Sequence, residues 1–307
     1  MLDEAEILRH DRSDLHGQLL ALAASDAGEA ELKPLPGPYG GVAYGEPELA
    51  LSLCEQWIGA GLGPGTRFIL SDGSDGGEAA EFAHLAGLEG ARFCWLGQPT
   101  EEIPLSLGVE AGPLSTYRYA QYLARATGHA EEAEQAKAAL TELAERCQFA
   151  VSSEVNPAKQ LAWQLWTRLP VLLSSPGSWL PAWGWQTLIA RIGKSFSVVI
   201  EHLPALVLSG GFEARHETGD QMVALLIGRD DPGSALLEKV LSSRVDEVQR
   251  VSAPPGLSSY GEALYLWALG AWTSFYLALS YGQDPSDSPA LLALQRLWRP
   301  LAEPDDG

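Results

Sequence analysis

Residues 71–78, Ser-Asp-Gly-Ser-Asp-Gly-Gly-Glu, constrain the fold of this chain more than any other segment. They directly follow the apolar run 68–70 and directly precede the helix-like run 79–88. A strand, a Gly/Ser loop and a helix in that order form an anion site in parallel α/β sheets, because backbone N–H groups point outward where the helix begins. The loop also carries its own anions, and Asp75 and Glu78 have the spacing of a capping box. The segment therefore has two interpretations, a phosphate site or a capped turn.

Length and composition favour two domains in a soluble protein. The chain has 307 residues, of which 46% are apolar, and this exceeds the usual size of a single domain. Forty acidic side chains against 20 basic ones give a net charge of −20, which repels nucleic acid and anionic lipid. We therefore expect neither a nucleic-acid nor a membrane partner. The three cysteines are widely spaced, and the acidic N-terminus lacks an apolar signal segment, so we expect reduced thiols and a cytoplasmic location.

One stretch, residues 263–281, tests the expectation of a soluble protein. It carries no formal charge over a length that can span a membrane. Its aromatic and hydroxyl side chains are spread through the middle, whereas membrane-spanning helices gather aromatics at their two ends. The pattern predicts a helix buried inside the protein.

Alternating strand and helix patterns run along the whole chain. We expect strands at 67–70, 92–96, 107–110, 171–174, 205–208, 222–227 and 247–251. We expect helices at 2–24, 47–58, 79–88, 115–127, 130–147, 156–167, 179–194, 232–241, from 258 onward and at 290–297. This order predicts an α/β fold with parallel sheets flanked by helices. The pattern restarts near residue 150, so we expect one domain over residues 1–150 and a second over residues 151–307, with the last helices packing back on the sheets.

Several short motifs in the second half carry a family resemblance. They are Asn-Pro-Ala-Lys at 156–159, Trp-Gln-Thr at 185–187, and Ser-Phe-Tyr-Leu-Ala-Leu at 274–279 followed by Gly-Gln-Asp-Pro at 282–285. Together they resemble the bifunctional phosphoglucose/phosphomannose isomerase family of the sugar-isomerase (SIS) superfamily. The resemblance implies two flavodoxin-like SIS domains, each a parallel sheet sandwiched by helices. It also implies a homodimer that interconverts aldose and ketose 6-phosphates.

The resemblance places a phosphate-binding set in the first half. Ser71, Gly73, Ser74 and Gly76 correspond to the family's Ser/Thr-rich phosphate loop, with glycine at Gly73 and Gly76 where the family has Ser and Thr. A glycine-rich turn of the family resembles residues 39–43, which include Gly41. Both hydroxyls that remain, on Ser71 and Ser74, can donate to a phosphate.

The catalytic set that the resemblance implies is replaced in this chain. A carboxylate must move a proton between C1 and C2 of the sugar. The family's glutamate aligns with Arg191, which stays protonated and has no acceptor lone pair. No histidine stands in residues 205–211, where the family has one, and the family's C-terminal lysine aligns with Trp298. We therefore expect weak or absent isomerase activity.

The remaining candidates each have a functional and a structural interpretation. Arg191 is either an anion-binding residue in the place of the carboxylate or a solvated or ion-paired helix residue. Glu213 and His216 lie in a polar loop where the family's active-site loop falls. Histidine as a residue type titrates near neutral pH, so His202 joins them as the third candidate catalytic residue. A solvated loop is the alternative. Five tryptophans between residues 163 and 185 indicate a core or dimer interface, with sugar stacking as the alternative.

Two functions are compatible with these features. The first is a glucose-6-phosphate or mannose-6-phosphate isomerase homologue that binds a carbohydrate derivative with a degraded catalytic set. The second is a non-catalytic dimer that binds or senses a sugar or sugar phosphate. No metal-ligand repeat such as HExxH and no GxGxxG fingerprint is present. The sequence therefore predicts a small-molecule sugar partner, no metal and no cofactor.

Overall fold

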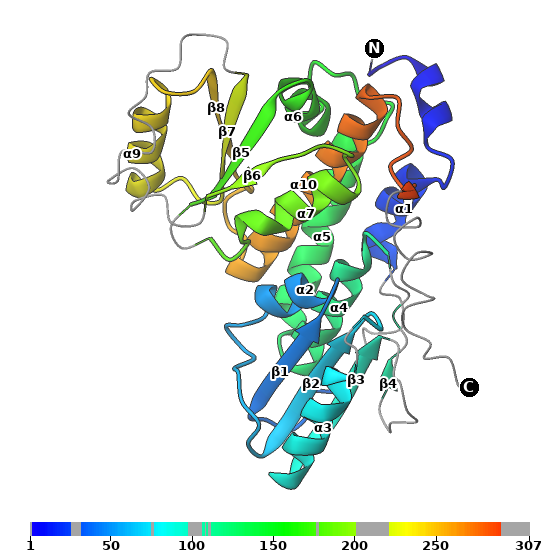
Figure 1. Cartoon of the computed structure of the whole chain (residues 1–307), viewed down its shortest axis with the longest axis vertical. Coiled ribbons are helices and arrows are strands. Elements are labelled where there is room, and N and C mark those ends of the chain that lie inside the picture. The colour runs from blue at the N-terminus through cyan, green and yellow to red at the C-terminus, as the bar shows by residue number, and fades with distance from the viewer. Residues whose placement is uncertain are drawn as a thin grey trace, which may run out of the picture.

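Two parallel β-sheets form the framework of the protein (Figure 1). The computed structural model describes residues 2–25, 32–74, 77–97, 106–107, 109, 112–175, 178–200 and 221–289. The first sheet has the order β1 (Tyr39–Tyr44), β2 (Gly65–Ser71), β3 (Ala91–Gly97) and β4 (Ser106–Leu107). The second has the order β6 (Val198–Val199), β5 (Leu169–Ser174), β7 (Met222–Ile227) and β8 (Glu247–Val251). All pairings are parallel, so the predicted α/β class is confirmed.

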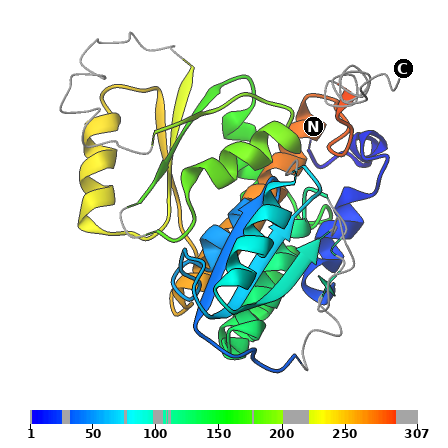
Figure 2. The same ribbon diagram turned by 60° about the horizontal axis from the view of Figure 1, so that its bottom comes forward.

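Helices cover both faces of the first sheet because its central strands are apolar on both sides. Ile69 and Trp95 pack with Ala79 of α3 (Glu78–Leu88) on one face. Phe68 and Cys94 point the other way, into the main core, which includes α2 (Glu48–Leu53) and α4 (Ser115–Ala126). Figure 2 shows α3 in cyan across one face and green helices across the other. This alternation follows the two-residue period of a strand.

The second sheet repeats this arrangement. Leu173 and Leu226 pack with Leu241 of α9 (Pro232–Leu241) on one face. Leu172 and Leu225 belong to the main core on the other face, together with α6 (Pro157–Leu165) and α7 (Ala182–Arg191). Figure 1 shows α9 on the outer side of this sheet and α7 on the inner side. The two halves thus meet through the inner helices.

The helix α10 (Ser259–Ser280) joins the two halves. Its N-cap, Ser258, accepts a 3.1 Å hydrogen bond from the backbone of Gly261. The helix is buried over almost its whole length and packs against α5 (Ala130–Cys147), α6 and α7. Trp185 of α7 donates its indole N–H to the carbonyl of Leu266 at 3.0 Å. The stretch that is long and apolar enough to cross a membrane is therefore a core helix, as predicted.

The structure departs from the prediction at the N-terminus. The helix predicted at 2–24 is instead η1 (Ala5–His10), α1 (Leu15–Ala21) and η2 (Leu22–Ala24). The cause is local: Asp11 accepts the backbone N–H groups of Leu15 and His16 at 2.8 and 2.9 Å, and Asp14 is left-handed with φ 54°. The hydrogen bonds to the Asp11 side chain take the place of backbone bonds that a continuous helix would need, so the helix is interrupted there.

Other segments differ in smaller ways. Residues 39–43, where the family resemblance predicts a turn, lie in β1, and the sequence pattern gives no signal for β6. The helices predicted at 47–58 and 179–194 are shorter: α2 ends at Leu53, and α7 begins after Pro181 and ends at Arg191. The strand predicted at 205–208 and the helix predicted at 290–297 lie outside the described residues. The domain division at residue 150 remains a prediction.

Candidate functional site

The carboxyl edge of the first sheet gathers polar residues from two neighbouring strands. β1 and β2 run in parallel with Tyr44 opposite Ser71, so both strands end at the same level. Gly45 and Glu46 follow β1, and the Asp-Gly-Ser segment at 72–74 follows β2. Ligands of open α/β sheets bind at this edge, which makes it the candidate site.

A carboxylate of the protein itself occupies the backbone donors at this edge. Asp72 accepts the backbone N–H of Glu46 at 2.9 Å through Oδ2 and that of Ser74 at 3.0 Å through Oδ1. The hydroxyl of Ser71 accepts the N–H of Gly73 at 3.0 Å. Gly45 has φ +76°, and a Cβ there would lie 2.4 Å from Asp72 Oδ2, so only glycine permits this approach. The loop therefore carries an anion where a phosphate loop would receive one.

The same carboxylate influences a buried phenol. Tyr119 of α4 is almost fully buried, and its hydroxyl has no hydrogen-bond partner within the described chain. Burial raises the pKa of Tyr119 to about 12, and the nearby charge of Asp72 adds to the rise. The phenol therefore stays protonated and can serve only as a neutral donor or acceptor.

The start of α3 corrects one prediction. The helix begins at Glu78, with Gly77 as its N-cap at φ 98° and no side-chain capping bond. Glu78 is thus the first helical residue and not the fourth residue of a capping box, so that interpretation is wrong. A left-handed N-cap favours glycine, which explains the glycine at position 77. Asp75 and Gly76 lie outside the described residues.

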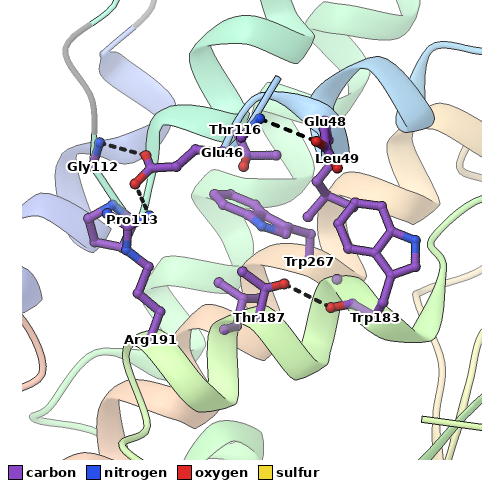
Figure 3. Close-up of a pocket in the computed structure, with 13 residues that line it drawn as sticks. Glu46, Glu48, Leu49, Gly112, Pro113, Thr116, Trp183, Thr187, Arg191 and Trp267 are labelled. Carbon is purple, nitrogen blue, oxygen red and sulfur yellow. Dashed lines mark hydrogen bonds and ion pairs between the residues drawn. The ribbon is translucent and has the colours of Figure 1, made fainter. Parts of the chain in front are cut away.

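A pocket of about 300 Å³ lies beside this edge, between the two halves (Figure 3). One wall comes from the segment after β1 and from the turn before α4, and the opposite wall comes from α7 and α10. Gly184 of α7 lets the halves approach, because a Cβ there would lie 3.1 Å from Leu49. The lining residues include Glu46, Glu48, Leu49, Gly112, Pro113, Thr116, Trp183, Thr187, Leu188, Arg191 and Trp267.

An ion pair between Arg191 and Glu46 joins the two walls. The other carboxylate oxygen of Glu46 accepts the N–H of Gly112 at 3.0 Å and the hydroxyl of Ser115 at 3.3 Å. Burial lowers the pKa of Arg191, but a guanidinium titrates far above neutral pH and stays charged. Arg191 is thus an ion-paired residue at the end of α7. An anion-binding role remains a prediction.

The rest of the pocket is aromatic and apolar. Figure 3 shows Trp183 on the side opposite the ion pair and Trp267 between them. The indole N–H of Trp267 is buried and has no hydrogen-bond partner within the described chain. Indole faces contact the C–H faces of a sugar ring, while the charged rim and the hydroxyls of Thr116 and Thr187 can bind its hydroxyls. This combination suits a carbohydrate.

The structure brings together some of the predicted site residues. Arg191 lies in the pocket, and Ser71, Gly73 and Ser74 lie at the adjacent sheet edge. Gly41 lies inside β1, where a Cβ would contact Leu51 and Ile58, so it packs below the edge. Gly76 and the three candidate catalytic residues His202, Glu213 and His216 lie outside the described residues.

Sequence reasoning missed Glu46 and Trp267. Glu46 comes two residues after the last residue of β1, and that position at a parallel sheet edge was the available signal. Trp267 gave no signal, because a tryptophan in an apolar helix is typical of a core residue. Within the described residues, no group of three or more His, Cys, Asp or Glu side chains is placed to hold a metal ion.

Comparisons with known proteins identify the family of the chain. Residues 15–128 match the phosphoglucose isomerase N-terminal domain, and residues 154–297 match the bacterial phospho-glucose isomerase C-terminal SIS domain. The chain is similar to the crystal structure of a glucose-6-phosphate isomerase like protein from Thermus thermophilus. The identity is 34%, the alignment covers 96% of this chain and 99% of that chain, and the TM-score is 0.80. No curated protein matches the chain significantly.

More distant structures share the fold alone. A glucosamine-6-phosphate deaminase from Thermotoga maritima is 13% identical with a TM-score of 0.58, over 94% of this chain and 98% of that chain. A glucose-6-phosphate isomerase from Chlamydia trachomatis is also 13% identical, with a TM-score of 0.56 over 98% of this chain and 76% of that chain. The fold is therefore that of two SIS-type domains, as predicted. The chain belongs to the phosphoglucose isomerase family of SIS-domain proteins.

Proposed function

We propose that the chain binds a hexose or hexose phosphate in the pocket between its halves and interconverts aldose and ketose 6-phosphates slowly or not at all. The observation that carries the proposal is the Glu46–Arg191 pair, which places a guanidinium and an already engaged carboxylate at the pocket. The family supports a sugar phosphate as the ligand class, since a glucose-6-phosphate isomerase like protein is 34% identical to this chain.

Isomerisation needs a carboxylate that can accept and return a proton. Arg191 has no acceptor lone pair, and both oxygens of Glu46 already accept bonds from Arg191, Gly112 and Ser115. Without a positioned base the rate falls by a factor on the order of 100 to 10,000. Glu213, His216 and His202 stay proposed as candidates for any residual proton transfer.

The binding mode follows from the walls of the pocket. A sugar ring lies against Trp183, with the buried Trp267 forming the floor beneath it, and its hydroxyls reach Thr116 and Thr187. A phosphate extends toward the sheet edge, where Ser71, Gly73, Ser74 and Gly76 are the proposed contacts and Gly41 supports them from below. Asp72 opposes this phosphate by charge, so the uncharged part of the ligand provides most of the affinity.

A non-catalytic sensing dimer is the second candidate. The engaged carboxylates favour it, and so do aromatic side chains on the surface, since Trp163 and Phe196 are 55% and 73% exposed. Exposed aromatics are typical of interfaces. We expect a homodimer in the cytoplasm, and light scattering that gives the mass of a monomer at micromolar concentration would count against the dimer.

Titration calorimetry with glucose, fructose 6-phosphate and glucose 6-phosphate tests the binding site. The expected result is binding that Trp183→Ala weakens and that Trp163→Ala leaves unchanged. Trp163 is the matched control because it is exposed on α6 and does not line the pocket. Absence of binding for all three sugars, or equal losses in the two variants, would contradict the proposal.

A further inference from the structure

A second cavity, of about 460 Å³, lies between α5, α6, the end of β8 and α10. It shares no lining residue with the pocket between the halves. Tyr265 and Leu269 of α10 line it, whereas Trp267 of the same helix lines the first pocket. Residues four apart share a helix face and residues two apart do not, so the two cavities lie on opposite faces of α10.

Arg146 provides a free positive charge at this cavity. It makes no ion pair with the described part of the chain, and its guanidinium donates to the hydroxyl of Tyr265 at 3.4 Å. Burial raises the pKa of Tyr265, so its hydroxyl keeps its own proton to donate. Two groups of donors, one of them charged, therefore converge on one side of the cavity.

Gln164 provides an acceptor in the same cavity. Its side-chain Oε1 is buried and has no hydrogen-bond partner within the described chain. Buried polar atoms are nearly always hydrogen-bonded in folded proteins, so an unpaired acceptor beside a cavity is a candidate contact for a ligand or a water molecule. A hydroxyl donor on a ligand would satisfy it.

The charge of the lining is opposite to that of the protein. The chain has 40 acidic and 20 basic side chains, yet the described lining contains Arg146 and Arg250 and no carboxylate. Arg250 already pairs with Glu238 and Asp230, which leaves Arg146 to attract an anion. The volume falls in the range of small-molecule sites.

We infer that this cavity is a second binding site, for a small anion that also carries a hydroxyl group. The anionic group binds Arg146 and the hydroxyl of Tyr265, and the ligand's hydroxyl donates to Gln164. This inference does not depend on the proposed function, because it concerns different residues on the opposite face of α10.

Calorimetry on the full chain tests the site with glycerol 3-phosphate, inorganic phosphate and glycerol as probes. The expected order of affinity is glycerol 3-phosphate above phosphate, with no binding of glycerol. Arg146→Met keeps the aliphatic stem and should lower the affinity for both anions about tenfold or more. Gln164→Leu should weaken glycerol 3-phosphate alone, because phosphate does not need the acceptor.

Arg229→Met is the matched control, since it removes a guanidinium that lines neither cavity and should leave these affinities unchanged. No binding of either anion to the wild type would overturn the inference, and so would unchanged binding to Arg146→Met. Loss of binding in Arg229→Met would show that the anion depends on a charge outside the cavity and would also overturn it. Failure of hexoses to bind would affect only the proposed function.

Discussion

The carboxylate of Asp72 accepts a 2.9 Å hydrogen bond from the backbone N–H of Glu46, and this bond joins the ends of two neighbouring strands. Glu46 in turn forms an ion pair with Arg191 on the opposite wall of the pocket. Two carboxylates thus occupy donors that an anionic ligand would use. The chain keeps the fold of its family, while Asp72, Glu46 and Arg191 at the carboxyl edge of the first sheet bind one another or nearby backbone groups.

Replacing Asp72 by asparagine should strengthen the binding of phosphorylated sugars. Two unit charges about 10 Å apart at an effective dielectric near 20 repel by about 1 to 2 kcal/mol, so the affinity for glucose 6-phosphate should rise about tenfold. Glucose carries no charge, and its affinity should stay the same. Calorimetric titration of both sugars measures the difference. An equal gain for both, or none for the phosphate, would rule out electrostatic opposition by Asp72.

The Glu46–Arg191 pair should stabilise the contact between the halves modestly. Its side chains are 18% and 32% exposed, so water screens the pair only in part. A double-mutant cycle with Glu46→Gln and Arg191→Met should give a coupling free energy of about 1 kcal/mol in urea unfolding. A coupling indistinguishable from zero would mean that the two side chains act independently.

Removing the carboxylate of Asp3 should destabilise the second half of the protein. The buried ammonium of Lys159 donates to Asp3 at 2.7 Å and to the carbonyls of Phe149 and Val151 at 2.8 and 2.9 Å. Asp3→Asn leaves this charge without its counterion, and we expect a loss of about 1 to 3 kcal/mol of unfolding free energy. Ser153→Ala is the control, because it removes only a hydroxyl bond to Asp3. Equal effects of the two changes would show that the charge is unimportant.

His16 should make stability depend on pH in a defined direction. Its Nε2 accepts the backbone N–H of Phe149 at 3.1 Å, and its ring packs against Trp272. The folded protein therefore favours the neutral imidazole over the protonated one. Burial lowers the pKa of His16 from the ordinary value of 6.5. The unfolded chain therefore binds more protons, and stability is full above pH 6.5 and declines as the pH falls below it.

His16→Gln keeps an acceptor for Phe149 but does not titrate. Urea unfolding of both proteins at pH 7.5 and 5.5 should show a larger loss at low pH in the wild type than in the variant. Identical losses would assign the pH dependence to other groups.

Many elements could be predicted because they are long apolar or periodic runs between clear breaks. α5 and β7 have the predicted ends, and Asn156 caps α6 directly before Pro157, as the helix signals indicate. β1 was missed as a strand because Tyr-Gly-Gly-Val-Ala-Tyr has weak strand propensity, and pairing with β2 fixes its conformation.

The site could be predicted less well than the fold. Its position at the end of β2 follows from the strand, loop and helix order at residues 65–88. The pairing of Glu46 with Arg191 depends on how α7 packs against the segment after β1, and no local pattern encodes that contact. The bonds from Asp72 to two backbone groups likewise depend on the register of β1 and β2.

The most direct test of the account is the rate at which purified protein converts fructose 6-phosphate to glucose 6-phosphate in a coupled-enzyme assay. Because the catalytic set is replaced, turnover should lie far below the value on the order of 10 per second that is typical of enzymes. Arg191→Glu should restore little activity, because catalytic groups act as a unit. Turnover of the wild type near 10 per second would contradict the degraded catalytic set.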